Sequence, residues 1–171
     1  MNVGFVNGCY DLLHDGHKLM LKAALEQCDH LVIALNSDES VKRLKGPSRP
    51  IWDFETRFNA IYDYCLGLRA KGMKTTCAII PFEGKKDPLL MNLRPDTFFV
   101  GYDHSAAPVF YRRIGWKDLP NGEKAWEGPK VIQLPQLAGV STTKLIEAQN
   151  ERSEEHTSEL QSHSFISYAV F

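Results

Sequence analysis

The sequence lacks the features that mark several large classes of protein. Its four cysteines form no CxxC pair and no metal-ligand spacing, so neither a zinc site nor a disulfide scaffold is expected. The 20 basic residues balance the 21 acidic ones, which leaves no electrostatic footprint for non-specific binding of nucleic acid. No apolar run reaches membrane-spanning length, and the N-terminus shows no signal-peptide pattern. We therefore expect a cytoplasmic protein with reduced thiols and with neither a nucleic-acid nor a membrane partner.

The pattern of apolar residues predicts the fold class. At 171 residues and 43% hydrophobic content, the chain is long enough for one well-buried domain. Apolar runs recur with helix-like segments between them, at residues 2–6, 30–35, 75–80, 97–100 and 131–134. Strands separated by helices imply parallel crossovers and a sheet covered on both faces. The predicted fold is a Rossmann-like α/β domain with a five-stranded parallel sheet and helices on both faces.

The N-terminal segment NGCYDLLHDGHKLMLKAAL carries the most informative pattern. We expect a turn at residues 7–8 after the first strand, and a helix over residues 18–25. His14 and His17 lie three residues apart around Gly16, where the first N–H groups of the helix have no partner. The arrangement suits a phosphate, because a helix N-terminus is partly positive and imidazole rings can donate hydrogen bonds. Taken alone, the pair fits phosphate binding and a purely structural role equally well; in the structural role, one histidine caps the helix and the other packs against the sheet.

A second pattern, GVSTTKLIEA, lies far away in the sequence at residues 139–148. Ser141 is a strong helix N-cap, and its hydroxyl could hold the outer phosphates of a nucleotide together with the N–H groups of Thr142 and Thr143. A plain helix cap is the better explanation of this segment by itself. In a Rossmann-like sheet, however, ligands bind at the carboxyl ends of the strands, where both patterns would meet. The two patterns together therefore predict one phosphate-binding pocket.

Three segments resemble a known superfamily. GCYDLLHDGH resembles the nucleotide-binding signature of the cytidylyltransferase-like nucleotidylyltransferases, and GVSTTKLIEA resembles their other phosphate-binding segment. SDESVKRLKGPSRPI resembles the corresponding segment of bacterial sugar-phosphate adenylyltransferases, especially the heptose 1-phosphate adenylyltransferases. The resemblance extends with gaps over residues 3–148. It implies transfer of a nucleotidyl group from a nucleoside triphosphate to a phosphorylated sugar or polyol, with release of pyrophosphate.

The resemblance also implies roles for particular residues. His14 and His17 would donate to the phosphates, and Lys45 would neutralise charge on the transferred and leaving groups. Nucleotide binding is expected at Gly8, Cys9, Tyr10, Asp11, Gly16, Lys42, Arg57, Gly101, Asp103, Ser141, Thr142 and Thr143. The alternatives are an exposed, solvated turn for the lysines, a satisfied turn aspartate for Asp103 and a loop brace for Asp11. Mg²⁺ is expected on the nucleotide phosphates with few protein ligands, and members of the family are commonly homodimers.

The choice of nucleotide depends on one position. Gln136 stands where glycerol-phosphate and ethanolamine-phosphate cytidylyltransferases usually have an arginine that helps to read cytosine. The resemblance therefore favours ATP, with AMP as the transferred group. The alternatives are a CTP-dependent enzyme acting on glycerol 3-phosphate or phosphoethanolamine, and a nucleotide-binding module without catalysis. Residues 105–129 are expected to form a functional loop or lid that contributes to the acceptor pocket.

The end of the chain differs in composition from the rest. Residues 152–171 read RSEEHTSELQSHSFISYAVF, without Gly or Pro and without a steady hydrophobic period. RSEEHTSELQSH resembles the in-frame translation of a common sequencing adapter. We therefore expect a nucleotidylyltransferase domain over residues 1–151 and a non-native tail over residues 152–171, with an authentic amphipathic tail as the alternative.

Overall fold

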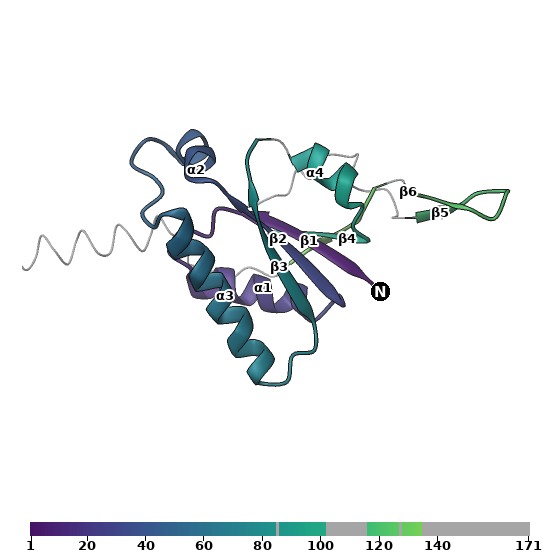
Figure 1. The fold of residues 1–171 in the computed structure, drawn as a ribbon, viewed down its shortest axis with the longest axis horizontal. Helices are drawn as coiled ribbons and strands as arrows, with labels where there is room; N and C mark the ends of the chain where they lie inside the picture. The colour runs from purple at the N-terminus through teal and green to yellow at the C-terminus, as the bar shows by residue number, and fades with distance from the viewer. Residues whose placement is uncertain (85, 102–115, 127, 135–171) are drawn as a thin grey trace, which may run out of the picture. The chain divides into compact units, whose positions relative to one another are not determined.

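A five-stranded parallel sheet forms the centre of the structure, a computed structural model that describes residues 1–84, 86–101, 116–126 and 128–134 (Figure 1). Its strands lie in the order β3-β2-β1-β4-β7 and neighbouring strands pair in parallel. They are β1 (Val3–Gly8), β2 (His30–Asn36), β3 (Thr76–Phe82), β4 (Thr97–Val100) and β7 (Lys130–Gln133). The predicted Rossmann-like α/β fold is confirmed.

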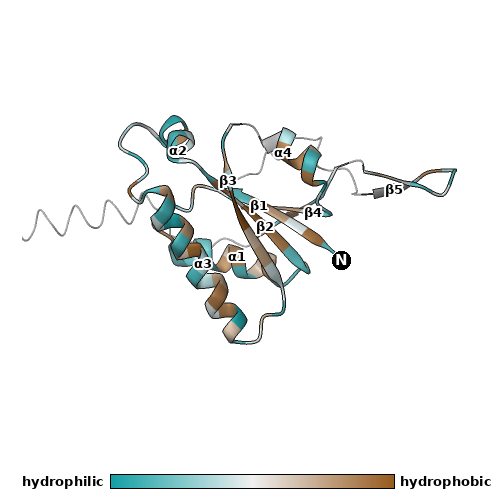
Figure 2. Cartoon of the chain, viewed as in Figure 1, coloured by the Kyte–Doolittle hydropathy of each residue, from teal (hydrophilic) through white to brown (hydrophobic). Residues whose placement is uncertain are grey.

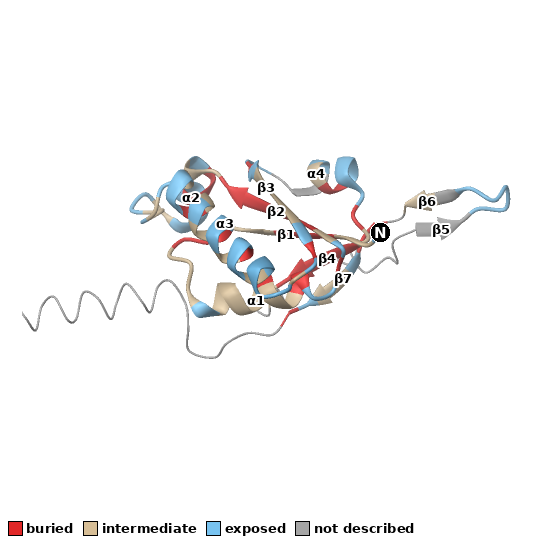
Figure 3. Cartoon of the chain, turned by 60° about the horizontal axis from the view of Figure 1, so that its bottom comes forward, coloured by how far each residue is buried: buried red, intermediate tan, exposed pale blue. Residues whose placement is uncertain are grey.

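Helices cover both faces of this sheet. They are α1 (Asp15–Leu25), α2 (Asp38–Lys45), α3 (Phe54–Ala70) and α4 (Lys86–Leu93). Side chains alternate along each strand, so a continuous apolar run supplies two core layers at once. In β2, Leu31 and Ile33 pack with α1 and α3, whereas Val32 packs on the opposite face with Leu90 of α4. Figure 2 shows the hydrophobic strands at the centre, and Figure 3 shows the buried residues concentrated there.

The strand order fixes where a ligand can bind. The chain runs outward from β1 through β2 to β3, and then returns to place β4 on the other side of β1. Parallel α/β sheets bind ligands beyond the carboxyl ends of their strands at such a reversal. The carboxyl end of β1 is Gly8, so the residues that follow it begin at this point. The histidine motif is therefore placed where the fold favours ligand binding.

Two local predictions were wrong at the start of the chain. Residues 7–8 continue β1, since Gly8 pairs with Leu35 of β2, and the chain turns only after them. Tyr10 and Leu12 turn it with positive φ angles of 47° and 52°, a conformation that is uncommon outside glycine. Helix α1 begins at Asp15, earlier than the predicted residues 18–25, because His14 acts as its N-cap. Both differences arise in the motif itself, where local propensity is weakest.

The segment predicted as a functional insertion contains a small hairpin. Strands β5 (Trp116–Asp118) and β6 (Lys124–Trp126) pair antiparallel in a separate two-stranded sheet. The indole N–H of Trp126 donates to the carbonyl oxygen of Pro95 over 3.0 Å, which ties the hairpin to the start of β4. The rest of residues 105–129 lies largely outside the described residues. Among the helices that the structure describes, none is long and apolar enough to cross a membrane.

Candidate active site

Two stacked imidazoles mark the N-terminus of α1. His14 caps the helix, and its Nδ1 accepts the backbone N–H of His17 over 3.3 Å. The two ring centroids lie 3.8 Å apart, with the ring planes inclined by 17°. Because Nδ1 of His14 acts as an acceptor, the proton of the neutral ring is assigned to Nε2. His14 is therefore the helix cap that sequence reasoning considered, and its Nε2–H is left as the donor of the ring.

His17 is a neutral donor at physiological pH. Burial lowers its pKa to about 3, and the nearby His14 and Lys45 add to this effect. Burial also lowers the pKa of His14. The ring of His17 meets the edge of Tyr10 at a centroid distance of 5.3 Å, and its Nδ1 has no hydrogen-bond partner among the described residues. Two neutral imidazoles at a helix N-terminus can donate N–H groups to an anion, but they bring no positive charge of their own.

The carboxylate of Asp11 braces its own loop. It accepts hydrogen bonds from Nε of Arg49 at 2.7 Å and from the backbone N–H groups of Ile51 and Trp52, each at 3.0 Å. The side chain of Asp11 is 1% exposed. Burial by itself would raise the pKa of this carboxyl, but the hydrogen bonds from Trp52, Ile51 and Arg49 outweigh it and hold the pKa below its usual range. The brace that sequence reasoning weighed as an alternative is what the geometry shows.

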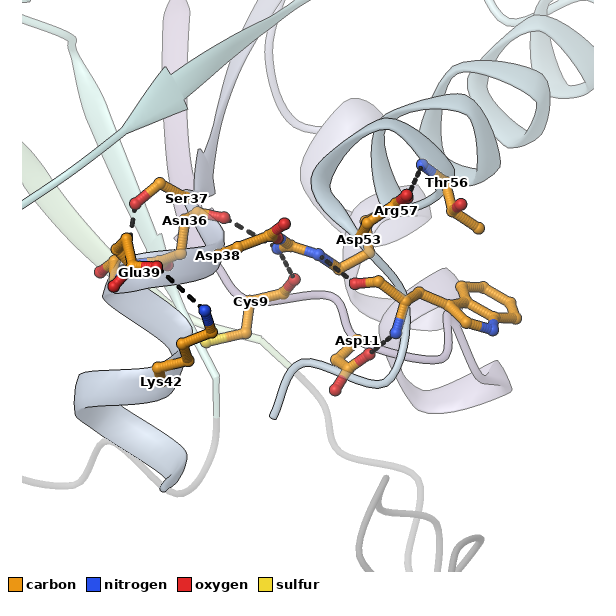
Figure 4. Close-up of polar contacts among 12 residues, drawn as sticks. Cys9, Asp11, Asn36, Ser37, Asp38, Glu39, Lys42, Asp53, Thr56 and Arg57 are labelled. Carbon is orange, nitrogen blue, oxygen red and sulfur yellow. Dashed lines mark hydrogen bonds and ion pairs between the residues drawn. The ribbon is translucent and has the colours of Figure 1, made fainter. Parts of the chain in front are cut away.

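Arg57 connects three segments from a buried position at the start of α3. Its Nη1 donates to the backbone oxygens of Cys9 at 2.7 Å and Asn36 at 2.8 Å, and its Nε donates to that of Trp52 at 3.0 Å (Figure 4). Its Nη2 pairs with the carboxylate of Asp38 at 2.5 Å. The side chain of Arg57 is 0% exposed. The guanidinium of Arg57 thus ties the loops together, and nucleotide binding by Arg57 stays a prediction.

The basic residues lie in the last turn of α2. Ser37 caps this helix, since its hydroxyl accepts the N–H of Ser40 over 3.1 Å. Lys42 pairs with Glu39 at 3.0 Å. Lys45, the final residue, forms no ion pair with any described residue, and its charge acts on both His17 and Cys9. Of the two lysines predicted to bind phosphate, Lys45 is therefore the better placed to supply positive charge to the histidine pair.

The remaining predicted residues divide into two groups. Gly8 and Cys9 join β1 to the motif loop, Gly16 lies in the first turn of α1, and Gly101 follows the neighbouring strand β4 at the same edge of the sheet. Outside the described residues lie Asp103, Gln136, Ser141, Thr142, Thr143 and the tail over residues 152–171. The described residues of the predicted site thus lie together around the carboxyl end of β1.

Sequence reasoning missed two residues of this region. Asp38 looks like an ordinary acidic residue in the first turn of a helix, and Arg49 looks like part of an exposed turn before a proline. Their partners Arg57 and Asp11 lie 19 and 38 residues away in the sequence. The sequence offers the residue types for such pairs, a basic residue and a motif aspartate. Nothing in the local sequence indicates which of them meet in the folded chain.

Fold and site together define a Rossmann-like α/β domain with a histidine pair at the N-terminus of its first helix. The chain belongs to the cytidylyltransferase-like family, whose model matches residues 5–148. It is 37% identical over 147 residues to the bifunctional protein HldE of Mesorhizobium japonicum, and 36% identical over 149 residues to that of Granulibacter bethesdensis. These matches cover 85% of this chain in each case but only 26% and 27% of the relatives. The chain thus spans about a quarter of the length of the curated relatives it matches.

Solved structures share the fold. A lipopolysaccharide core biosynthesis protein from Thermoplasma volcanium superimposes with a TM-score of 0.54 and 23% sequence identity, covering 80% of this chain and 98% of the other. A protein of unknown function from Archaeoglobus fulgidus gives a TM-score of 0.57 at 13% identity, covering 82% and 94% of the two chains. At these identities the likeness concerns the architecture alone.

Proposed function

We propose that this domain transfers AMP from ATP to the phosphate of a phosphorylated sugar, with release of pyrophosphate. The observation that carries the proposal is the stacked pair of neutral imidazoles at the N-terminus of α1, placed at the strand-order reversal of the sheet. Membership of the cytidylyltransferase-like family supports a nucleotidyl transfer. The relatives named HldE and the segment SDESVKRLKGPSRPI support a sugar phosphate as acceptor. Gln136 in place of an arginine favours ATP over CTP.

The proposed chemistry needs no strong base in the protein. A phosphate oxygen of the acceptor attacks the α-phosphorus in line, the bond to the bridging oxygen breaks, and pyrophosphate leaves with its electron pair. Because the attacking phosphate is already an anion, catalysis comes from positioning and charge stabilisation. His14 and His17 donate hydrogen bonds to the phosphate oxygens, and Lys45 stabilises the negative charge that grows on the transferred and leaving groups.

Mg²⁺ is part of the proposal, held mainly by the nucleotide. No group of three or more His, Cys, Asp or Glu side chains able to hold a metal occurs among the residues that the structure describes. The carboxylate of Asp11, the acidic residue of the motif, accepts hydrogen bonds from Arg49 and two backbone N–H groups. Phosphate oxygens and water are ligands that Mg²⁺ prefers, and the bound ion would neutralise phosphate charge. A cytoplasmic homodimer remains an expectation from the sequence.

The direct test is pyrophosphate release by the purified protein. ATP and CTP are each combined with heptose 1-phosphate, glycerol 3-phosphate and phosphoethanolamine, with Mg²⁺ present or removed by EDTA. Release with ATP and the sugar phosphate, lost with EDTA and restored by Mg²⁺, is the expected result. Release with CTP instead would identify the alternative enzyme. Nucleotide binding without release for any pair would identify the non-catalytic module.

A matched pair of histidine variants locates the activity. His17→Ala is expected to lower kcat at least about a hundredfold, because removing one donor to a transition-state anion costs ~3 kcal/mol. His30→Ala is the control, since His30 bonds to Thr76 at the start of β2, at the opposite end of the strand from the site. Near-normal turnover of the His17 variant would contradict the assignment of the site.

A further inference from the structure

Helix α2 is held at both ends by ion pairs that reach the motif loop. At its first turn, Asp38 pairs with Nη2 of Arg57 at 2.5 Å. Beyond its last turn, Arg49 pairs with Asp11 at 2.7 Å through Nη2 as well as through Nε. Arg57 also holds the carbonyl oxygen of Cys9, and Asp11 itself belongs to the motif loop. Residues 38–49 are therefore fastened to residues 9–11 at both ends.

Little else fixes the position of this helix. Its residues are mostly hydrophilic, as Figure 2 shows, and only Ser40 and Val41 are buried. Ser40 accepts a hydrogen bond from the side chain of Asn36 at 2.9 Å. At the N-cap of α2, the backbone N–H of Ser37 donates to the carbonyl oxygen of Phe82 at 2.9 Å. The other ion pairs of the helix, Lys42 with Glu39 and Arg43 with Glu83, are exposed, and exposed ion pairs contribute little. With so small an apolar face, α2 gains much of its anchoring from the two ion pairs. Arg57, Arg49 and Asp11 are largely buried, whereas the side chain of Asp38 is 36% exposed.

The position of α2 decides where Lys45 lies. Lys45 ends the helix, and Gly46 follows it with a φ of 102°, so the chain changes direction there. The charge of Lys45 acts on His17 and on Cys9. A lysine side chain is flexible, so its ammonium group can serve the phosphates only if the backbone holds it within reach.

We propose that Asp38 and Arg49 are positioning residues, which hold the end of α2, and with it Lys45, against the motif loop through Arg57 and Asp11. The proposal rests on the proposed function for its chemical meaning, because Lys45 is useful there only if charge develops on a phosphate. Figure 4 shows Asp38, Arg57, Cys9 and Asp11 gathered between α2 and the start of α3. A displacement of about 1 Å at a reacting centre can cost up to about a hundredfold in rate, so two pairs outside the reacting atoms can control turnover.

The first test measures the position of Lys45 without relying on activity. Trypsin cleaves after Lys45 in proportion to how often the segment leaves its place, and mass spectrometry identifies that cut. Asp38→Asn and Arg49→Lys keep similar shape while weakening one pair each, and both are expected to speed this cleavage at least about threefold. Glu83→Gln is the control, because it breaks an exposed pair on the same helix and is expected to leave the rate unchanged. Unchanged cleavage in both folded variants would overturn the proposal.

The second test asks whether the two pairs act through Lys45. In the pyrophosphate assay, Asp38→Asn is expected to lower kcat about tenfold with a smaller change in KM for ATP, and Lys45→Ala to lower it further. Added to the Lys45→Ala variant, Asp38→Asn is expected to cost no more than about twofold. A full tenfold additional loss would overturn the link to Lys45. If the variants are cleaved faster but the wild-type protein shows no turnover, the proposed function is contradicted and the positioning role is still supported.

Discussion

Acidification is expected to destabilise this protein through His17. Folding lowers the pKa of His17 to about 3, from ~6.5 in an unfolded chain, so the unfolded state binds the extra proton between these values. The stability that depends on neutral His17 is therefore fully present above pH ~6.5, and it decreases as the pH falls toward the folded pKa. At pH 5 the unfolded imidazole is almost fully charged and the folded one is neutral. The loss there is ~2 kcal/mol, from ~1.5 pH units at ~1.36 kcal/mol each.

The measurement is the free energy of unfolding in urea between pH 7 and pH 5. The free energy of unfolding of the wild type should fall by at least the ~2 kcal/mol expected from His17. His14 adds to the fall, because burial lowers its pKa as well. Asp11 contributes almost nothing between pH 7 and pH 5, because its pKa in an unfolded chain is already ~3.9 and folding lowers it further. His17→Gln should flatten the pH dependence of the free energy of unfolding. A His17→Gln curve parallel to the wild-type curve would refute the reasoning, and with it the neutral state of the donor.

Three further predictions concern stability. Asp11→Ala leaves Arg49, whose side chain is 11% exposed, without its carboxylate, and should lower the free energy of unfolding in urea by ~3 kcal/mol; a loss below ~1 kcal/mol would contradict the brace. Tyr10→Phe removes a buried hydroxyl that has no hydrogen-bond partner among the described residues, so the variant should be as stable as the wild type or up to ~1 kcal/mol more stable. A clear loss in that variant would indicate a partner for the hydroxyl. Deleting residues 152–171 should leave the melting temperature unchanged, since their composition is unlike that of the domain; a large decrease would favour an authentic tail.

The fold could be predicted because its signals are local and repeated. In β2 every residue from Leu31 to Asn36 is buried. A strand that is covered on both faces needs apolar residues at nearly every position, so it is visible in the sequence as a continuous apolar run. The right-handed crossover rule fixes the hand of each connection, whereas the order of the strands comes from the structure. The motif loop was less predictable, because Tyr10 adopts a positive φ that nothing in its residue type requires. Its conformation is imposed by tertiary contacts such as the edge of the ring against His17.

The site was predictable as a set of residue types and less so as a set of roles. Arg57 follows Asn36 by 21 residues and Cys9 by 48, and only the folded chain places both carbonyl oxygens on its guanidinium. An arginine near a phosphate motif has the same sequence signature whether it binds the ligand or ties the loops. Burial favours the loop-tying role, because a guanidinium that is 0% exposed and donates to three backbone oxygens and a carboxylate has little left for a phosphate. Since both histidines are neutral and Arg57 is buried, Lys45 is the described residue best placed to bring positive charge to the site, and its position is the feature most worth perturbing.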